Sequence, residues 1–291
     1  MIISDIHKID LHMHTTVSDG TDTPEEILGR IRDLGMDLFS VTDHDAIRAS
    51  MEIPELRKEE DPHFLSGVEF SCQDEGGKYH ILGYGYDPSS EAIRKVVQMG
   101  HDIRLAKLKD RLDFLQETFG FDFPEEELRK LFAMENPGKP HIGNMMVRLG
   151  YVATKEDAIH DYINKKKGPS RHVRPEDAIE GILKSGGIPV LAHPTYGSGE
   201  ELILGDDMEE RLRHLLPFGL QGVEAYYSGF TDKIIAEMRA FAEKFDLYVT
   251  AGSDYHGRNK LVSLGDTNLE DAAQGPAGMK IFFEAVADRI C

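Results

Sequence analysis

The sequence predicts an α/β protein with a mainly parallel sheet or barrel and a helical insertion. Three observations lead to this class. Short apolar runs alternate with helical patterns near both ends of the chain, which is typical of βα units built on parallel strands. Residues 89–177 hold helical patterns and no convincing strand. The chain of 291 residues, 40% hydrophobic and 29% charged, is also long enough to bury a full core.

The first part of the chain begins with an apolar strand at residues 9–11. Thr23 and Pro24 then predict a helix that ends before Gly35, because threonine caps a helix and proline suits its first turn. Further strands are expected at residues 38–45, 63–72 and 78–86, with a helix from about Ala46 and a turn-rich link between the last two strands.

The alternation of predicted strands and helices stops between residues 89 and 177. Helical patterns cover residues 91–117, 124–132, 142–150 and 155–163, and a basic, turn-prone stretch follows at 164–177. Strands resume at 187–194, 222–227 and 248–257, with helices at 206–216 and 231–245. We therefore expect a barrel-forming part at 1–88 and 178–291, and a helical insertion at 89–177 that forms a cap.

Charge and cysteine content limit the classes of function. The balance of 52 acidic against 33 basic residues gives a net charge of −19, which disfavours a broad duplex-binding face but leaves small anionic substrates open. No apolar run approaches the roughly 20 residues that span a bilayer. The two cysteines and the absence of a signal-peptide pattern lead us to expect a cytoplasmic protein with no membrane partner.

Histidines and carboxylates gather where the predicted strands end. Side chains at alternate strand positions share a face, and α/β barrels assemble their sites at the carboxyl ends of strands. Taken singly, Asp43 could cap a helix and Glu69 could be a salt-bridge partner. Together the residues predict a centre for divalent ions, because imidazoles and carboxylates suit zinc, manganese and iron. They are His12, His14, Asp19, Asp43, His44, Asp45, Glu69, His80, His193, Asp254 and His256.

The motifs DLHMHTTVSDG, TDHD, GVEFS, HILGYG, LAHP and GSDYHG, in this order, resemble those of the PHP (polymerase and histidinol phosphatase) superfamily. The hairpin GVEFSCQDEGGKYHILGY, the insertion and SGGIPVLAHP are similar to its small stand-alone branch. That branch includes nucleoside 3′,5′-bisphosphate phosphatases and a 5′-to-3′ RNA exonuclease. The resemblance implies a distorted, TIM-like (β/α)7 barrel that holds two to three divalent ions of manganese, iron or zinc.

The resemblance also implies a role for each ligand position. One ion is expected at His12, His14, Glu69 and Asp254, a second at Glu69, His80 and His193, and a third at Asp19, His44 and His256. Glu69 would bridge the first two ions. Glu69, His193 and Asp254 are the expected catalytic residues.

This ligand set suits hydrolysis of a phosphate monoester. Two nearby ions can share a water and lower its pKa towards roughly 7, so we expect a metal-bridging hydroxide to attack a small, nucleotide-like substrate. The basic residues expected to bind the phosphate lie in the insertion, at Lys139, His141, Lys167 and Arg171. A solvated basic loop is the alternative interpretation. The branch commonly follows AHP with Gly-Arg-Tyr, whereas this chain has Thr195-Tyr196-Gly197.

Three alternatives remain open at this point. The enzyme could be a histidinol phosphate phosphatase, or an exonuclease that trims short oligonucleotide ends from 5′ to 3′. A non-catalytic regulatory module that contains metal is the third, although several full ligand sets favour catalysis over a structural role. The sequence leaves the oligomeric state unknown.

Overall fold

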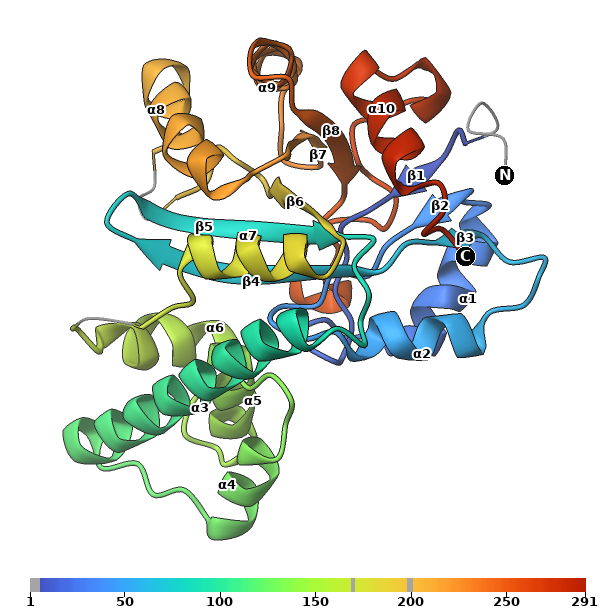
Figure 1. Cartoon of the computed structure of the whole chain (residues 1–291). Helices are drawn as coiled ribbons and strands as arrows, with labels where there is room; N and C mark the ends of the chain where they lie inside the picture. Colours follow the sequence, from blue (N-terminus) through green and yellow to red (C-terminus); the bar gives the residue numbers. More distant parts are fainter. Residues whose placement is uncertain (1–5, 169–170, 198–200) are drawn as a thin grey trace.

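The computed structural model describes residues 6–168, 171–197 and 201–291. Its strands are β1 (Ile9–Asp10), β2 (Leu38–Phe39), β3 (His63–Phe64), β4 (Gly67–Asp74), β5 (Gly77–Tyr84), β6 (Ile188–Leu191), β7 (Gly222–Tyr227) and β8 (Tyr248–Gly252). Its α-helices are α1 (Pro24–Leu34), α2 (Arg48–Leu56), α3 (Glu91–Phe119), α4 (Glu125–Phe132), α5 (Lys139–Arg148), α6 (Lys155–Asp157), α7 (Pro175–Lys184), α8 (Gly205–Leu215), α9 (Asp232–Lys244) and α10 (Ala277–Val286). Figure 1 shows α8, α9 and α10 on one side of the strands, and α3 to α6 on the other side, below the hairpin β4–β5. The expected α/β class is confirmed.

The strands register as two sheets within the described residues. One has the order β1-β2-β3 and is parallel throughout. The other has the order β4-β5-β6-β7-β8, in which β5 runs antiparallel to both of its neighbours. The antiparallel pairs follow from the tight connection between β4 and β5, because a short turn can join only antiparallel strands.

Backbone hydrogen bonds join the two sheets at both edges. Leu11 N–H donates to the Ala251 carbonyl at 3.0 Å, which links the end of β1 to β8. Asp45 N–H donates to the Glu69 carbonyl at 2.9 Å, which links the segment after β2 to β4. The strands therefore form two sheets joined by hydrogen-bonded seams, and the closed barrel that the family resemblance implies remains a prediction.

Local sequence signals account for α1. Thr23 accepts from Glu26 N–H, the Glu26 side chain accepts from Thr23 N–H, and Gly35 ends the helix at a φ of 60°. This reciprocal cap satisfies backbone groups that the first turn leaves free, and glycine tolerates the left-handed end.

The expected strand at residues 38–45 is shorter than predicted. Only Leu38 and Phe39 belong to the ladder. Beyond them, Thr42 N–H still donates to the Met13 carbonyl at 2.9 Å, so the chain stays beside the end of β1 while it turns. Asp43, His44 and Asp45, which follow, therefore lie at the carboxyl end of the sheet β1-β2-β3.

Helices α3 to α6 surround an apolar cluster of their own. Its fully buried members include Leu108, Leu115 and Ile142. The turn after α6 continues as a π-helix at Ala158–Tyr162 and a 3-10 helix at Ile163–Lys165, where a single regular helix was predicted. Helix α5 begins at Lys139, three residues before the predicted start. The division into barrel and cap remains a prediction.

Among the described residues, none of the helices combines the length and the apolar character that crossing a bilayer requires.

Close packing between β4 and the segment after β2 gives a stability test. A Cβ atom on Gly67 would lie 2.7 Å from the Val41 carbonyl oxygen. We expect Gly67→Ala to lower the free energy of unfolding by about 1–3 kcal/mol, because backbone atoms cannot yield. Gly29→Ala, where α1 leaves open space around the added Cβ, should raise it by about 0.5–1 kcal/mol. Urea unfolding of both variants measures the difference, and equal stabilities would contradict this packing.

Candidate metal centre

The end of β1 delivers the first two histidines to the centre. Leu11 is bonded to β8, and Met13 forms a parallel bridge with Tyr255. His12 and His14, on either side of Met13, are both fully buried. Their rings lie 5.3 Å apart between centroids, so the alternating pattern brings the two imidazoles into one pocket, as the sequence predicts.

Glu69, the third residue of β4, is the centre of the cluster. Its Oε2 lies within 3.3 Å of ring nitrogens of His12, His14 and His44, and its Oε1 within 3.1 Å of ring nitrogens of His80 and His193. Burial acts to raise the pKa of this carboxyl, but the surrounding imidazoles outweigh burial and hold the pKa well below its usual range. Glu69 is therefore an ionised carboxylate at neutral pH.

Two further carboxylates complete the cluster. Asp254 Oδ1 lies 3.3 Å from His14 Nε2 and 3.4 Å from His256 Nδ1. Asp19 Oδ1 lies 3.3 Å from His256 Nε2. The structure thus brings together all nine predicted ligand side chains, and their ligand roles remain predictions.

Several buried polar atoms in the cluster have no hydrogen-bond partner among the described residues. They are His12 Nε2, His14 Nε2, His44 Nδ1, His193 Nδ1 and Glu69 Oε2. Buried polar groups are normally satisfied. Possible ligand atoms lie within 4.8 Å of one another in three sets: His12, His14, Glu69 and Asp254; His14, Asp19, His44 and His256; and His44, Glu69 and His80. These imidazole and carboxylate donors fit divalent ions such as zinc, manganese or iron.

Two of the cluster residues have strained backbones. His193 has a φ of 24° and Asp254 a φ of 58°, in the left-handed region that residues with a Cβ rarely occupy. Such strain persists only where the surroundings enforce it, and it is common at functional sites.

Asp43 organises the loop between His14 and Asp19. Its carboxylate accepts hydrogen bonds from Thr15 N–H at 2.8 Å, the Thr15 hydroxyl at 2.7 Å and the Ser18 hydroxyl at 2.6 Å. The alternative role as a helix cap is wrong, because Ile47 occupies the N-cap position of α2.

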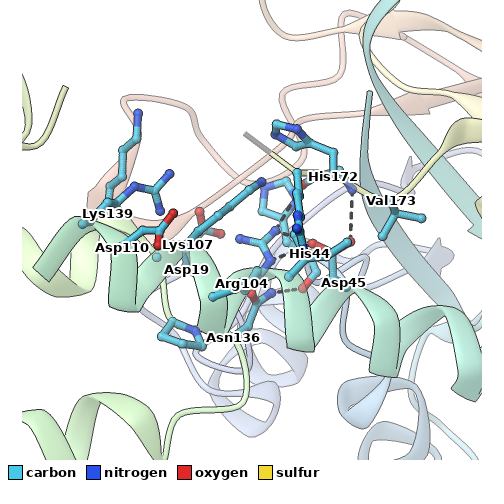
Figure 2. Close-up of a pocket in the computed structure, with 18 of the residues that line it drawn as sticks. Asp19, His44, Asp45, Arg104, Lys107, Asp110, Asn136, Lys139, His172 and Val173 are labelled. Atoms are coloured by element: carbon cyan, nitrogen blue, oxygen red, sulfur yellow. Dashed lines mark hydrogen bonds and ion pairs between the residues drawn. The ribbon is translucent and has the colours of Figure 1, made fainter. Parts of the chain in front are cut away.

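A basic cavity of about 950 Å³ opens beside the cluster (Figure 2). Asp19, His44 and His80 line its inner end. Three of the predicted substrate-binding residues, Lys139, Lys167 and Arg171, also line it. The fourth, His141, does not line the cavity. Its Nδ1 accepts from Gly138 N–H at 3.0 Å, which caps the first turn of α5.

The sequence interpretation missed the cations that α3 contributes to this cavity. Arg104, Lys107 and Arg111 all line it, and Figure 2 shows Arg104 and Lys107 extending from α3 towards Asp19 and His44. Their spacing of three and four residues places them on one helix face, so this signal was present in the sequence. Burial, followed by the charges of Arg104 and Arg111, lowers the pKa of Lys107 to about 7.

A second cavity of about 500 Å³ meets the same cluster from another direction. Tyr196, Tyr227 and Lys260 line it, together with Asp254 and His193. The Tyr227 hydroxyl donates to Asp254 Oδ2 at 2.9 Å, and Lys260 is ion-paired with the same oxygen. The predicted ligand cluster therefore lies where a strongly basic cavity meets an aromatic one.

An α/β fold that buries histidines and carboxylates at the ends of its strands defines a metal-dependent hydrolytic class. Residues 10–153 match the family model described as the PHP domain. The chain is a PHP domain protein, and the resemblance drawn from its motifs is confirmed. It is a metal-dependent phosphoesterase of this family.

Three curated relatives align with most of the chain. A 5′-3′ exoribonuclease of Haemophilus influenzae is 28% identical, over 89% of this chain and 93% of its own. A phosphoribosyl 1,2-cyclic phosphate 1,2-diphosphodiesterase of Eggerthella lenta is 28% identical, over 86% and 94%. A 3′,5′-nucleoside bisphosphate phosphatase of Chromobacterium violaceum is 29% identical, over 85% and 87%. These relatives share phosphoester chemistry and differ in substrate.

The fold is similar to that of a solved structure. It is a metal-dependent phosphoesterase from Bifidobacterium adolescentis, 29% identical, with a TM-score of 0.78 over 91% of this chain and 93% of its own.

The cluster predicts a metal content above one ion per chain, because its donors exceed what one ion can use. Elemental analysis of purified protein should find more than one equivalent of manganese, iron or zinc. Glu69→Gln should lower the metal content, because each of the two Glu69 carboxylate oxygens contacts a predicted ligand, His12 or His80. Asp271→Asn is the matched control, since Asp271 pairs with His7 outside the cluster. A metal-free wild type, even after incubation with excess ion, would contradict the prediction.

Proposed function

We propose that this enzyme hydrolyses a phosphate monoester on a small, nucleotide-like molecule. The observation that carries the proposal is the junction between the buried cluster and a basic cavity in a chain of net charge −19. A cavity lined by cations in an acidic protein selects anions locally, because nearby charges dominate the potential inside a pocket.

Glu69, His193 and Asp254 are the proposed catalytic residues. Together with His12, His14, Asp19, His44, His80 and His256, they would hold two to three divalent ions. When bound, the ions would supply a water-derived nucleophile at neutral pH and positive charge for the phosphoryl oxygens. Glu69 supports a bridging role because both of its oxygens contact imidazoles.

The chain's own cations would bind and orient the substrate. Lys107 and Arg111 make no ion pair within the part of the chain that the structure describes, and both face the cavity. Unpaired, half-buried cations repel one another, so a polyanionic substrate would relieve this repulsion. Lys139, Lys167 and Arg171 surround the same space.

The fold supports separate parts for metal binding and for substrate binding. We propose that the two sheets act together as the distorted (β/α)7 barrel, since hydrogen bonds join them at both seams. Residues 89–177 would form the cap, since their helices have their own apolar cluster and line the basic cavity.

A second candidate is 5′-3′ exonuclease activity on short RNA. It is favoured by the relative from Haemophilus influenzae that carries this name. The acidic exterior would still exclude long polymers by charge repulsion.

A substrate panel tests the proposed function. We expect the metal-loaded enzyme to release inorganic phosphate from nucleoside 3′,5′-bisphosphates faster than from histidinol phosphate or p-nitrophenyl phosphate. Short oligoribonucleotides in the same panel report the second candidate, through the appearance of mononucleotides. A phosphoribosyl cyclic phosphate should be included, because one relative acts on that class. If the metal-loaded protein cleaves none of these phosphate esters, the proposed substrate class is wrong.

The basic cavity gives a separate prediction. Arg171→Ala, Lys139→Ala and Lys107→Ala should each lower kcat/KM on the best substrate by about one to two decades, because a charge-assisted hydrogen bond contributes about 1.5–3 kcal/mol. Metal content should not change. Lys165→Ala is the control, since Lys165 is exposed and does not line the cavity. Wild-type kcat/KM in all three variants would exclude this cavity as the phosphate site.

A further inference from the structure

Glu224 is a buried carboxylate outside the predicted ligand set. It lies in the middle of β7 and is fully buried. The structure gives it no lysine or arginine partner among the described residues. An ionised side chain in such a position is unfavourable unless hydrogen bonds compensate it, and both of its oxygens are in fact used.

The first oxygen contacts a predicted ligand. Glu224 Oε1 lies 2.9 Å from His12 Nδ1. A carboxylate can only accept, so Nδ1 carries a proton, and in the neutral ring that binds a metal ion Nε2 keeps its lone pair. His12 Nε2 is buried without a hydrogen-bond partner and lies 3.3 Å from Glu69 Oε2 and 3.5 Å from Asp254 Oδ1. The contact thus selects the tautomer in which Nε2 can bind a metal ion.

The second oxygen contacts the backbone of another predicted ligand. Glu224 Oε2 accepts from His193 N–H at 2.7 Å. His193 follows β6 and has the left-handed φ of 24°, a conformation that needs support from its surroundings. In this conformation the ring reaches Glu69, with His193 Nε2 3.1 Å from Glu69 Oε1.

The neighbouring strand is shaped to admit this carboxylate. A Cβ atom on Gly252, at the end of β8, would lie 2.6 Å from Glu224 Oε1 and 2.2 Å from His12 Cβ. Only glycine therefore allows Glu224 and His12 to meet at this point.

We propose that Glu224 is a positioning residue for the metal centre, fixing the tautomer of His12 and the turn at His193 together. The inference rests on the proposed function, because it assumes that both histidines bind metal. Glu224 would act through them, on ligands assigned to two different ions, without binding an ion itself. Outer carboxylates of this kind typically change metal affinity by 10–100-fold when they are removed.

The test is metal affinity of the full chain carrying Glu224→Gln. Glutamine has the same shape, but its NH₂ group cannot accept, so either one of the two hydrogen bonds is lost or His12 Nδ1 becomes the acceptor and the ring proton moves to Nε2. The stripped protein is titrated with Zn²⁺ and, separately, Mn²⁺ against a chromogenic chelator. We expect the apparent affinity of at least one ion to fall 10–100-fold. In the ¹⁵N spectrum of loaded wild type, we expect a His12 ring with a protonated Nδ1 and a metal-bound Nε2, and a mixture of ring states in the variant.

Tyr84→Phe is the matched control. The Tyr84 hydroxyl is buried and donates to the Leu11 carbonyl at 2.9 Å, one residue from His12, and it makes no hydrogen bond to a predicted ligand. This variant should lose thermal stability in the stripped state and keep wild-type metal affinity, which separates a structural effect from positioning.

The outcomes are distinct. Wild-type metal affinity and an unchanged ¹⁵N spectrum in Glu224→Gln would overturn the positioning role while leaving the proposed function intact. A wild-type protein that binds no metal would overturn both. If Glu224→Gln does not fold, Glu224→Asp decides: the shorter carboxylate cannot reach both partners, so unchanged affinity would overturn the inference and reduced affinity would support it.

Discussion

The burial of Glu69 among five imidazoles is the constraint on which the rest of the molecule depends. Both carboxylate oxygens are enclosed by ring nitrogens, and Asp254 lies against two of the same rings. So many ionisable groups can share a dry pocket only if cations and hydrogen bonds compensate them. The short strands serve this requirement, because β1 and β6 end just before His12 and His193, whose rings contact Glu69.

The sequence predicted those parts of the site that follow from local order along the chain. His12, His14, His44, His193 and His256 each follow a strand, and parallel strands bring their carboxyl ends together. Glu224 could not be found in this way. It lies within the predicted strand 222–227 like any core position, and its partners come from β1 and from the turn after β6. Only the tertiary pairing of three distant segments shows what its carboxylate does.

The errors in the predicted elements also have physical causes. The strand predicted at 38–45 ends at Phe39, because the backbone then turns to pair with β4, where His44 forms a parallel bridge with Glu69. An apolar run with polar ends cannot by itself show where the ladder stops. The phosphate-binding residues were predicted at Lys139, His141, Lys167 and Arg171, whereas α3 contributes further cations to the basic cavity.

Hydrogen bonds connect the helical segment 89–177 to the loop that carries His44, a predicted metal ligand. Arg104 on α3 donates to Asp45 Oδ2 at 2.7 Å and to Ser71 Oγ at 3.1 Å. Asp45 has a φ of 49° and directly follows His44. The Asn136 amide, in the connection between α4 and α5, donates to the His44 carbonyl. The residues that form the cavity therefore also hold the loop that carries a predicted ligand. One set of contacts thus serves both purposes, since Arg104 lines the basic cavity and also holds Asp45 beside His44.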